Sequence, residues 1–479
     1  MDATAQAELV RSGEASPSEL VEAAIRRVEQ VNPELNAVIH PLYDEGRAAV
    51  SNSLPDGPFR GVPFLFKDIG AMLAGQPFHM GMRLLKEIGF RAPIDSYLGQ
   101  RFRDAGFVTI GKTNTPELGI LPTTEPQAYG PTRNPWDVAR SPGGSSGGAA
   151  AAVASGMVPV AHANDGGGSI RIPASFCGLV GLKPTRQRIS QGPIVGDTLT
   201  GMVCELVVSR SVRDTAAVLD AVHGAAPGDP YVAPPPTRPY VDELEADPKG
   251  LRIGLVTESA ARIEIDDATV EAARGAGELL SSLGHSVSEQ SMAGVAGGDP
   301  DELVETFMTR WMGGQAATLD QLSRLLGRAI GPDDVEPLTW ALAEEGRRRS
   351  AGDYLNAVDR HNLVTRLISM QLDSDFDLLV TPTTGEAAPE LGTFDDSGPD
   401  PLRAIRRAYK TAAFSGIFNA TGHPAISLPL HWSGSGLPIG VQLVAAHGGE
   451  DTLIAVAAQL ERARPWADRT PPVFASSDT

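Results

Sequence analysis

From about residue 60 onward, the chain alternates short apolar runs with stretches of helical pattern, and this alternation limits the fold more than any other feature. The apolar runs are bounded by glycine and proline and lie at 62–66, 107–110, 157–161 and 179–182. Runs this short and this apolar are typical of strands that are buried on both faces. Helical stretches lie between them, around 97–104 and 146–154. Strands that alternate with helices predict an α/β layered fold with helices on both faces of the sheet.

The flanking parts of the chain continue this pattern. Ser16-Pro17-Ser18-Glu19 combines an N-cap, a proline at the first helical position and a capping-box glutamate, so a helix is expected to begin there. The proline-rich stretch 225–250 is interpreted as a stiff surface crossing. Further strands are expected at 251–256, near Val287, at 376–380 and at 425–430, and further helices at 269–283 and 452–463. The stretch 301–372 looks mainly helical and predicts a lobe over one edge of the sheet.

We predict one domain that spans residues 1–479. The sequence contains no internal repeat and no linker flexible enough to require separate domains, and a chain of this length can build one large core. The core is expected to come from about 60–225 and 370–479, with a more variable, partly helical region at about 226–370.

The charge and the apolar pattern exclude two classes of partner. The formal net charge is −19, with no basic arm, and such a chain would repel a nucleic-acid backbone. The best candidate for a membrane-spanning segment, 149–161, is interrupted by serine, glycine and proline, so no membrane span is predicted. The beginning of the sequence has no secretory signal pattern.

The cysteine and histidine content also limits the chemistry. Cys177 and Cys204 are the only cysteines and do not form a Cys-x-x-Cys pair, which predicts buried thiols in a reducing cytoplasm. The nine histidines form no close cluster with the spacing of metal ligands. We therefore predict neither a metal nor another cofactor.

Two loops rich in glycine and serine carry the strongest chemical signal. The segment 141–148 reads Ser-Pro-Gly-Gly-Ser-Ser-Gly-Gly, and 164–171 reads Asn-Asp-Gly-Gly-Gly-Ser-Ile-Arg. Consecutive glycines allow neighbouring backbone N–H groups to converge on one point, where they can stabilise a developing anion. Ser169 at the end of the second loop is a candidate nucleophile, with its oxyanion bound by the N–H groups of Gly166, Gly167, Gly168 and Ser169 itself. The alternative for each loop is a flexible turn without chemistry.

A serine nucleophile needs a base, and Lys67 is the candidate. Lys67 ends the apolar run Val-Pro-Phe-Leu-Phe, where burial would lower the pKa of its amine and leave it neutral enough to accept a proton. The alternative is a strand-end lysine that reaches solvent or pairs with Asp68.

Other nucleophile and phosphate-binding motifs fit the sequence poorly. Gly143-Gly144-Ser145-Ser146-Gly147 has the letters of a nucleophile elbow, but Arg-Ser-Pro precedes it where that elbow follows a strand. No Ser-x-x-Lys occurs, and the glycines of the first loop run into alanines where a P-loop has lysine. His162 lies in an expected strand and is interpreted as a core or supporting residue.

With these motifs, the chain resembles the amidase signature family. The resemblance rests on the two glycine-serine loops, on Cys-Gly-Leu-Val-Gly-Leu-Lys-Pro-Thr at 177–185, and on Gly-Val-Pro-Phe-Leu-Phe-Lys-Asp at 61–68. Segments 111–117 and 419–425 add to it, so the likeness covers nearly the whole chain. It implies the amidase signature fold, in which helices cover both faces of a central mixed β-sheet. The segments 2–13 and 133–136 resemble family members that hydrolyse cyclic amides.

The resemblance also implies a Ser–cis-Ser–Lys triad. Ser169 corresponds to the nucleophile, Ser145 to the serine in a cis peptide that relays protons, and Lys67 to the general base. Ser146, Asp165 and Arg171 are expected to support these three residues. The chain differs from the common Thr-Asp-Thr-Gly-Gly-Ser pattern at 164–169, and we expect glycine at position 166 to loosen the oxyanion loop.

These features predict a hydrolase that cleaves C–N bonds of linear or cyclic amides, and also carbamates (urethanes) and esters, through an acyl-enzyme. Its partner is then a small-molecule amide or carbamate, with no direct nucleic acid, and a homodimer is compatible with this interpretation. One alternative is the A subunit of glutamyl-tRNA amidotransferase, which releases ammonia from glutamine within a complex. A second is an inactive binding protein on the same scaffold.

Overall fold

One mixed sheet contains all eleven strands of the computed structural model, which describes residues 1–297 and 299–476. The strand order is β1-β3-β2-β4-β6-β5-β10-β11-β9-β7-β8. The strands are β1 (Val38–Pro41), β2 (Pro63–Lys67), β3 (Val108–Thr113), β4 (Val160–Asp165), β5 (Val180–Lys183), β6 (Cys204–Ser209), β7 (Arg252–Val256), β8 (Ser286–Gln290), β9 (Leu378–Pro382), β10 (Ala425–Trp432) and β11 (Pro438–Val444). β2 pairs in parallel with β3 and β4, whereas β4 and β6 are antiparallel.

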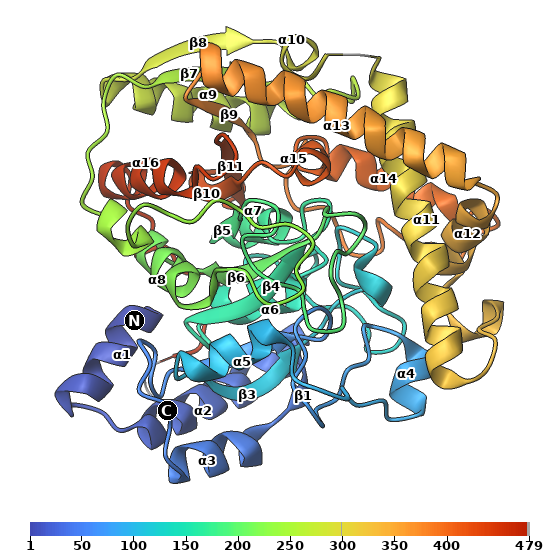
Figure 1. Cartoon of the computed structure of the whole chain (residues 1–479). Helices are drawn as coiled ribbons and strands as arrows, with labels where there is room; N and C mark the ends of the chain where they lie inside the picture. Colours follow the sequence, from blue (N-terminus) through green and yellow to red (C-terminus); the bar gives the residue numbers. More distant parts are fainter. Residues whose placement is uncertain (298, 477–479) are drawn as a thin grey trace.

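Helices cover both faces of this sheet, as Figure 1 shows. They are α1 (Ala3–Ser12), α2 (Pro17–Leu35), α3 (Tyr43–Ser51), α4 (Arg83–Glu87), α5 (Tyr97–Asp104), α6 (Gly147–Ala154), α7 (Arg171–Cys177), α8 (Val212–Val222), α9 (Asp267–Ser282), α10 (Met292–Ala296), α11 (Pro300–Leu326), α12 (Pro337–Arg347), α13 (Ala351–Ser374), α14 (Leu402–Thr411), α15 (Gly416–Thr421) and α16 (Glu450–Ala463). Every residue of β2, β4, β5, β9 and β11 is buried, as expected for strands covered on both sides. The predicted α/β fold is therefore confirmed.

Most of the predicted elements are present. α2 begins at Pro17 with the expected capping box between Ser16 and Glu19. The strand expected at 157–161 begins only at Val160, because Gly156 with φ of 80° and Pro159 hold the chain in a turn. The patterns in the sequence did not predict β1, β6, β11 or α7, nor the helices α1, α3, α4, α8, α10, α14 and α15. α7 contains Pro173, which obscured its helical pattern.

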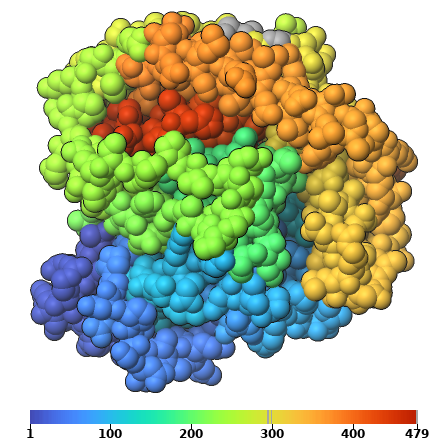
Figure 2. All heavy atoms as spheres, in the orientation of Figure 1, coloured from blue at the N-terminus to red at the C-terminus, as the bar shows by residue number. Residues whose placement is uncertain are grey.

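The expected lobe of helices is present, but it is not confined to one edge of the sheet. α11 packs against α12 and α13, and its buried Trp311 and Leu319 share an apolar cluster with Leu84 of α4. In Figure 2 the lobe runs down one side of the molecule, from the orange α13 through the yellow α11 to the blue segment that contains α4. α11 lies beside the loop that follows β4, because Trp311 and Phe307 are each 3.5 Å from the position that a Cβ atom would take at Gly166 and Gly167, respectively. The division into a core and a more variable region stays a prediction.

Among the described residues, no helix combines the length and the apolar character that a membrane crossing requires.

Candidate active site

Lys67 is the last residue of β2, and its side chain is fully buried, with an exposed fraction of 0%. Its Nζ donates hydrogen bonds to three oxygens: Ser145 Oγ at 2.7 Å, Ser146 Oγ at 2.9 Å and Asn164 Oδ1 at 2.6 Å. The alternative of a solvent-exposed lysine or a partner of Asp68 is wrong. Asp68 pairs instead with Lys112, at 2.7 Å between Nζ and Oδ1.

Burial also sets the protonation of this amine. Removal from water disfavours the charged form and lowers the pKa of Lys67 from 10.5 to about 7, although the negative charges of Glu205 and Asp165 act in the opposite direction. A substantial fraction of Lys67 is therefore neutral near pH 7, as a general base requires.

Ser145 lies in the first glycine-serine loop, which leads into α6. The Gly144–Ser145 peptide bond is cis. Glycine is required at position 144, because a Cβ atom there would lie 2.2 Å from the backbone oxygen of Thr123. Ser145 is buried, and Lys67 is its hydrogen-bond partner within the described part of the chain.

Ser169 lies between β4 and α7, in the second loop. Its exposed fraction is 8%, and it borders a cavity together with Gly167. Gly168 has φ of 134°, and a Cβ atom at this position would lie 2.3 Å from Ser415 Oγ. A glycine is therefore needed immediately before the candidate nucleophile.

The structure corrects one of the predicted oxyanion donors. The N–H of Gly168 donates to Asp165 Oδ1 at 2.7 Å, so this N–H is already occupied and is not available to a substrate. In the hydrogen bonds recorded for residues 1–297 and 299–476, the N–H groups of Gly166, Gly167 and Ser169 have no acceptor. These three remain the candidate donors.

Asp165 and Arg171 form the buried framework of the second loop. Arg171 Nε lies 2.9 Å from Asp165 Oδ2, and Asn419 Nδ2 donates to Asp165 Oδ1 at 2.8 Å. Burial by itself would raise the pKa of Asp165, but the charge and hydrogen bonds of Arg171 and the hydrogen bond from Asn419 outweigh it and hold this pKa below its usual range. Asp165 is therefore ionised and fixes the loop through the N–H groups of Gly168 and Ile170.

The sequence patterns gave no role to Asn164 or Glu205, two polar residues near Lys67. Asn164 accepts from Lys67 Nζ, and its Nδ2 lies 3.4 Å from Glu205 Oε1. His162 bridges Glu205 and β2, with Nε2 at 2.7 Å from Glu205 Oε2 and Nδ1 at 3.3 Å from the backbone N of Lys67. The interpretation of His162 as a buried supporting residue is consistent with these contacts. Asn164 could have been predicted from its position two residues after His162, because residues two apart in a strand lie on the same face of β4.

A cavity of about 150 Å³ opens beside Ser169. It is roughly ten times the volume that one water needs and is lined almost entirely by apolar side chains from six segments of the chain. These include Ile120, Phe307, Trp311, Ile405 and Ile417. No lysine, arginine, aspartate or glutamate from the described chain lines it. The site therefore accommodates an apolar, uncharged group next to the candidate nucleophile.

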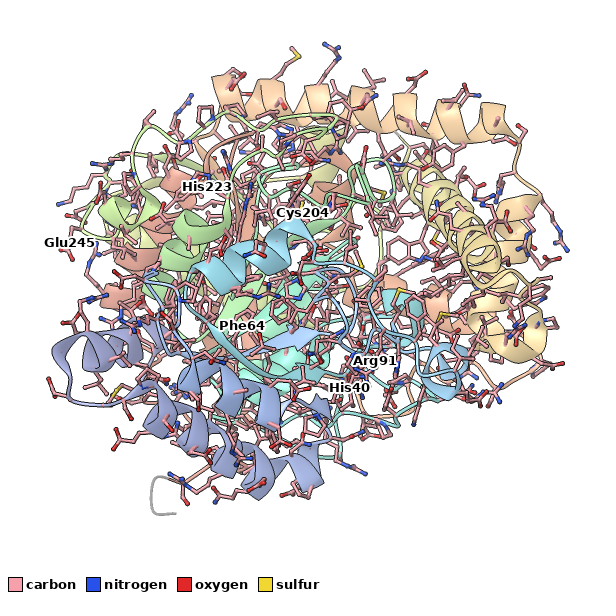
Figure 3. The ribbon with its side chains drawn as sticks, turned by 60° about the horizontal axis from the view of Figure 1, so that its bottom comes forward. His40, Phe64, Arg91, Cys204, His223 and Glu245 are labelled. Carbon is pink, nitrogen blue, oxygen red and sulfur yellow. The ribbon has the colours of Figure 1, made fainter. Side chains whose placement is uncertain are left out.

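One set of side chains has the composition of a cation site. Within the described residues, ligand atoms of His40, Asp68 and His79 lie within 4.8 Å of one another; His40 is labelled in Figure 3. Lys112 Nζ already lies 2.7 Å from Asp68 Oδ1, and its positive charge opposes a cation there. The described residues therefore give little support to a metal centre.

Comparisons with known proteins agree with this geometry. The model of the Amidase family matches residues 19–454. The 6-aminohexanoate-cyclic-dimer hydrolase of Paenarthrobacter ureafaciens is 45% identical over 478 residues, which cover 98% of this chain and 96% of that protein. The solved structure of 6-aminohexanoate cyclic dimer hydrolase aligns with a TM-score of 0.94 at 44% identity, over 99% of both chains.

The A subunit of glutamyl-tRNA amidotransferase, the first alternative function, is less similar to this chain. The solved structure of the A subunit of glutamyl-tRNA(Gln) amidotransferase from Thermotoga maritima is 27% identical, with a TM-score of 0.73, over 96% of this chain and 95% of that one. Both the sequence and the structure are thus more similar to the cyclic-dimer hydrolase, and the amidotransferase alternative is not supported.

Proposed function

This chain belongs to the amidase signature family and hydrolyses amide C–N bonds, and on that premise we propose that Ser169 is its nucleophile, Ser145 its proton relay and Lys67 its general base. The observation that carries the proposal is the 2.7 Å contact between Lys67 Nζ and Ser145 Oγ inside a buried site. An amine with a pKa of about 7 can accept the serine proton near neutral pH.

Acylation begins when Ser169 Oγ attacks the carbonyl carbon of the substrate. The proton of Ser169 passes to Ser145 Oγ while the proton of Ser145 passes to Lys67 Nζ, and a C–O bond forms. The N–H groups of Gly166, Gly167 and Ser169 stabilise the negative oxygen. The C–N bond then breaks, and the leaving amine takes a proton from Ser145, which recovers one from Lys67.

Deacylation repeats these transfers with water in place of Ser169. Water loses a proton toward neutral Lys67 through Ser145 and attacks the ester carbon of the acyl-enzyme. Collapse of the second tetrahedral intermediate breaks the bond to Ser169 Oγ, which recovers its proton. The acid product leaves, and the triad returns to its starting state.

The proposed substrates are uncharged amides with apolar groups beside the scissile bond. The cavity next to Ser169 offers no charged side chain to pair with a charged substrate, and desolvation would penalise one. His361, which lines the cavity, has a pKa lowered to about 3 by burial and by Arg310, so it is neutral. A cyclic diamide such as the 6-aminohexanoate dimer meets these requirements. Carbamates and esters present the same carbonyl to Ser169 and are proposed as further substrates.

A panel of substrates tests this proposal. It contains an aryl anilide, a nitrophenyl carbamate, the 6-aminohexanoate cyclic dimer and glutamine, each assayed with the wild-type enzyme and with Ser169→Ala. We expect turnover of the uncharged amides, little or none of glutamine, and loss of activity in Ser169→Ala. Undiminished activity of Ser169→Ala would contradict the proposed nucleophile, and a preference for glutamine would contradict the proposed substrate class.

The alternative of an inactive binding protein makes a different prediction. Such a protein would leave Ser169 unreactive toward a fluorophosphonate. The hydrogen bonds from Lys67 Nζ to Ser145 Oγ and Ser146 Oγ support a catalytically active site.

We also propose that the enzyme lies in the cytoplasm, on the basis of two buried cysteines that form no disulfide, one of which, Cys204, is labelled in Figure 3. A homodimer stays a prediction.

A further inference from the structure

We propose that Asn164 is a positioning residue that turns the lone pair of neutral Lys67 toward Ser145, and that Glu205 holds Asn164 in the required orientation. This inference rests on the proposed role of Lys67 as the base. It assigns a function to polar residues outside the triad.

The first step is the number of hydrogen bonds that Lys67 can donate. A charged ammonium has three N–H groups and satisfies Ser145, Ser146 and Asn164 together. A neutral amine has two N–H groups and one lone pair. The lone pair must face the one partner that can donate a proton to it.

Ser145 is that partner, because the other two oxygens have no proton to give. The hydroxyl of Ser146 donates to the backbone oxygen of Asn164 at 3.2 Å. Asn164 Oδ1 is a carbonyl oxygen and only accepts. Neutral Lys67 therefore donates to Ser146 and Asn164, and its lone pair points at the hydroxyl of Ser145.

The orientation of the Asn164 amide is fixed by its own donors. Nδ2 donates to the backbone oxygen of Ile69 at 3.2 Å and lies 3.4 Å from Glu205 Oε1. A flipped amide would place an NH₂ group against Lys67 and a carbonyl oxygen against the Glu205 carboxylate. Both contacts would be repulsive, so Glu205 selects the observed orientation.

Glu205 is itself anchored to β2 through His162. Nδ1 of His162 accepts from the backbone N–H of Lys67 at 3.3 Å, so Nε2 carries the ring proton and donates to Glu205 Oε2 at 2.7 Å. The chain of hydrogen bonds thus runs from the backbone of Lys67 back to its own amine. Gly70 leaves room for it, because a Cβ atom there would lie 2.4 Å from Asn164 Nδ2 and 2.6 Å from Glu205 Oε1.

An amide is better suited to this position than a carboxylate. Among the described residues, the carboxylates that act on the amine are Glu205 on β6 and Asp165 on β4, and both already favour the charged form of Lys67. His162 on β4 contacts Glu205 and the backbone of Lys67. A third carboxylate in direct contact would keep the amine protonated and unable to act as a base. Asn164 supplies the oxygen acceptor without the charge.

Two substitutions test the inference because they change the charge near Lys67 in opposite directions. Asn164→Asp adds a carboxylate at the amine, and Glu205→Gln removes one nearby. The measurement is the rate at which a fluorophosphonate labels Ser169 in the full chain between pH 5 and 10, which does not depend on the natural substrate. Glu243→Gln removes the partner of Arg238, in the segment 240–243 that packs on α8 and α16, and serves as the matched control.

We expect the acidic limb of the labelling rate to move upward by about one pH unit or more in Asn164→Asp and downward by a similar amount in Glu205→Gln, with no shift in Glu243→Gln. A merely structural role would lower the rates without opposite shifts. Should either variant fail to fold, as judged by thermal unfolding, the shift in the other decides the question. If the acidic limb of the labelling rate lay at the wild-type pH in both folded variants, the inference would be overturned, and the proposed triad would be unaffected. Absence of labelling at Ser169 in the wild type would overturn the proposed function and this inference with it.

Discussion

Lys67 Nζ lies 2.7 Å from Ser145 Oγ, and its three hydrogen-bond partners among the described residues are all uncharged oxygens. A buried lysine is normally compensated by a carboxylate in direct contact, as Lys112 is by Asp68. Lys67 is instead surrounded by acceptors that suit either protonation state. This arrangement distinguishes Lys67 from Lys112, whose amine is in direct contact with a carboxylate.

The first prediction concerns the pH dependence of catalysis. Below a pH of about 7 Lys67 binds a proton and cannot accept one from Ser145, so kcat/KM should fall about tenfold for each further pH unit. Lys67→Met should lower kcat/KM by about 10²–10⁴ and remove this limb from the remaining activity. Steady-state kinetics with an uncharged amide between pH 5 and 9 measures both. If the fall in kcat/KM at acidic pH persisted in Lys67→Met, the titrating group would be a residue other than Lys67.

The second prediction concerns stability. The pKa of Lys67 is about 7 in the folded chain and near 10.5 when unfolded, so between these values the unfolded chain binds more protons. The contribution of Lys67 to the free energy of unfolding should therefore increase as pH rises from about 7 to 10.5. Urea unfolding of the wild type and of Lys67→Met at several pH values should show a smaller rise in the variant. An equal rise in both proteins would mean that Lys67 keeps its proton in the fold.

The third prediction concerns the buried pair of Asp165 and Arg171. Asp165→Asn leaves the Arg171 guanidinium without its counter-charge and should lower the free energy of unfolding by about 3–5 kcal/mol. The exposed pair of Arg47 and Glu22 provides the control, since Glu22→Gln should cost less than about 1 kcal/mol. Thermal or urea unfolding gives both values, and similar costs would contradict the structural role given to Asp165.

The fourth prediction compares two glycines of the oxyanion loop. Gly168→Ala forces a Cβ atom to 2.3 Å from Ser415 Oγ at a φ of 134°, so the backbone must shift and kcat/KM should fall by about 10²–10³. In Gly166→Ala the nearest atom is Val203 Cγ2 at 3.2 Å, and the loss should stay below about tenfold. Comparable losses in the two variants would contradict the assignment of this loop.

The fifth prediction concerns the apolar cavity. Phe307 lines it, with its Cζ 3.5 Å from the Cβ position of Gly167. Phe307→Ala should raise KM for apolar amides by about tenfold or more through lost apolar contact, while fluorophosphonate labelling of Ser169 changes little. Leu325→Ala, at an exposed leucine of α11, should leave KM unchanged. An unchanged KM in Phe307→Ala would place the substrate elsewhere.

The sequence alone was sufficient to predict eight of the eleven strands, the glycine-serine loops and the positions of Lys67 and Ser169, because each depends on local patterns of apolar residues, glycine and proline. The use of the Gly168 N–H by Asp165 was not predictable, since it depends on how the loop folds back on the end of β4. Glu205 was missed for a similar reason. It lies in β6, which the apolar pattern did not identify, and its contact with Asn164 is created by antiparallel pairing of β6 with β4.

The most direct test of the account is the site at which a fluorophosphonate attaches, determined by peptide mass spectrometry of the wild type, Ser169→Ala and Lys67→Met at pH 8. The account predicts a single adduct on Ser169 in the wild type, none in Ser169→Ala, and labelling slowed by about 10² or more in Lys67→Met. An adduct of the same yield in Ser169→Ala, or wild-type labelling in Lys67→Met, would contradict it.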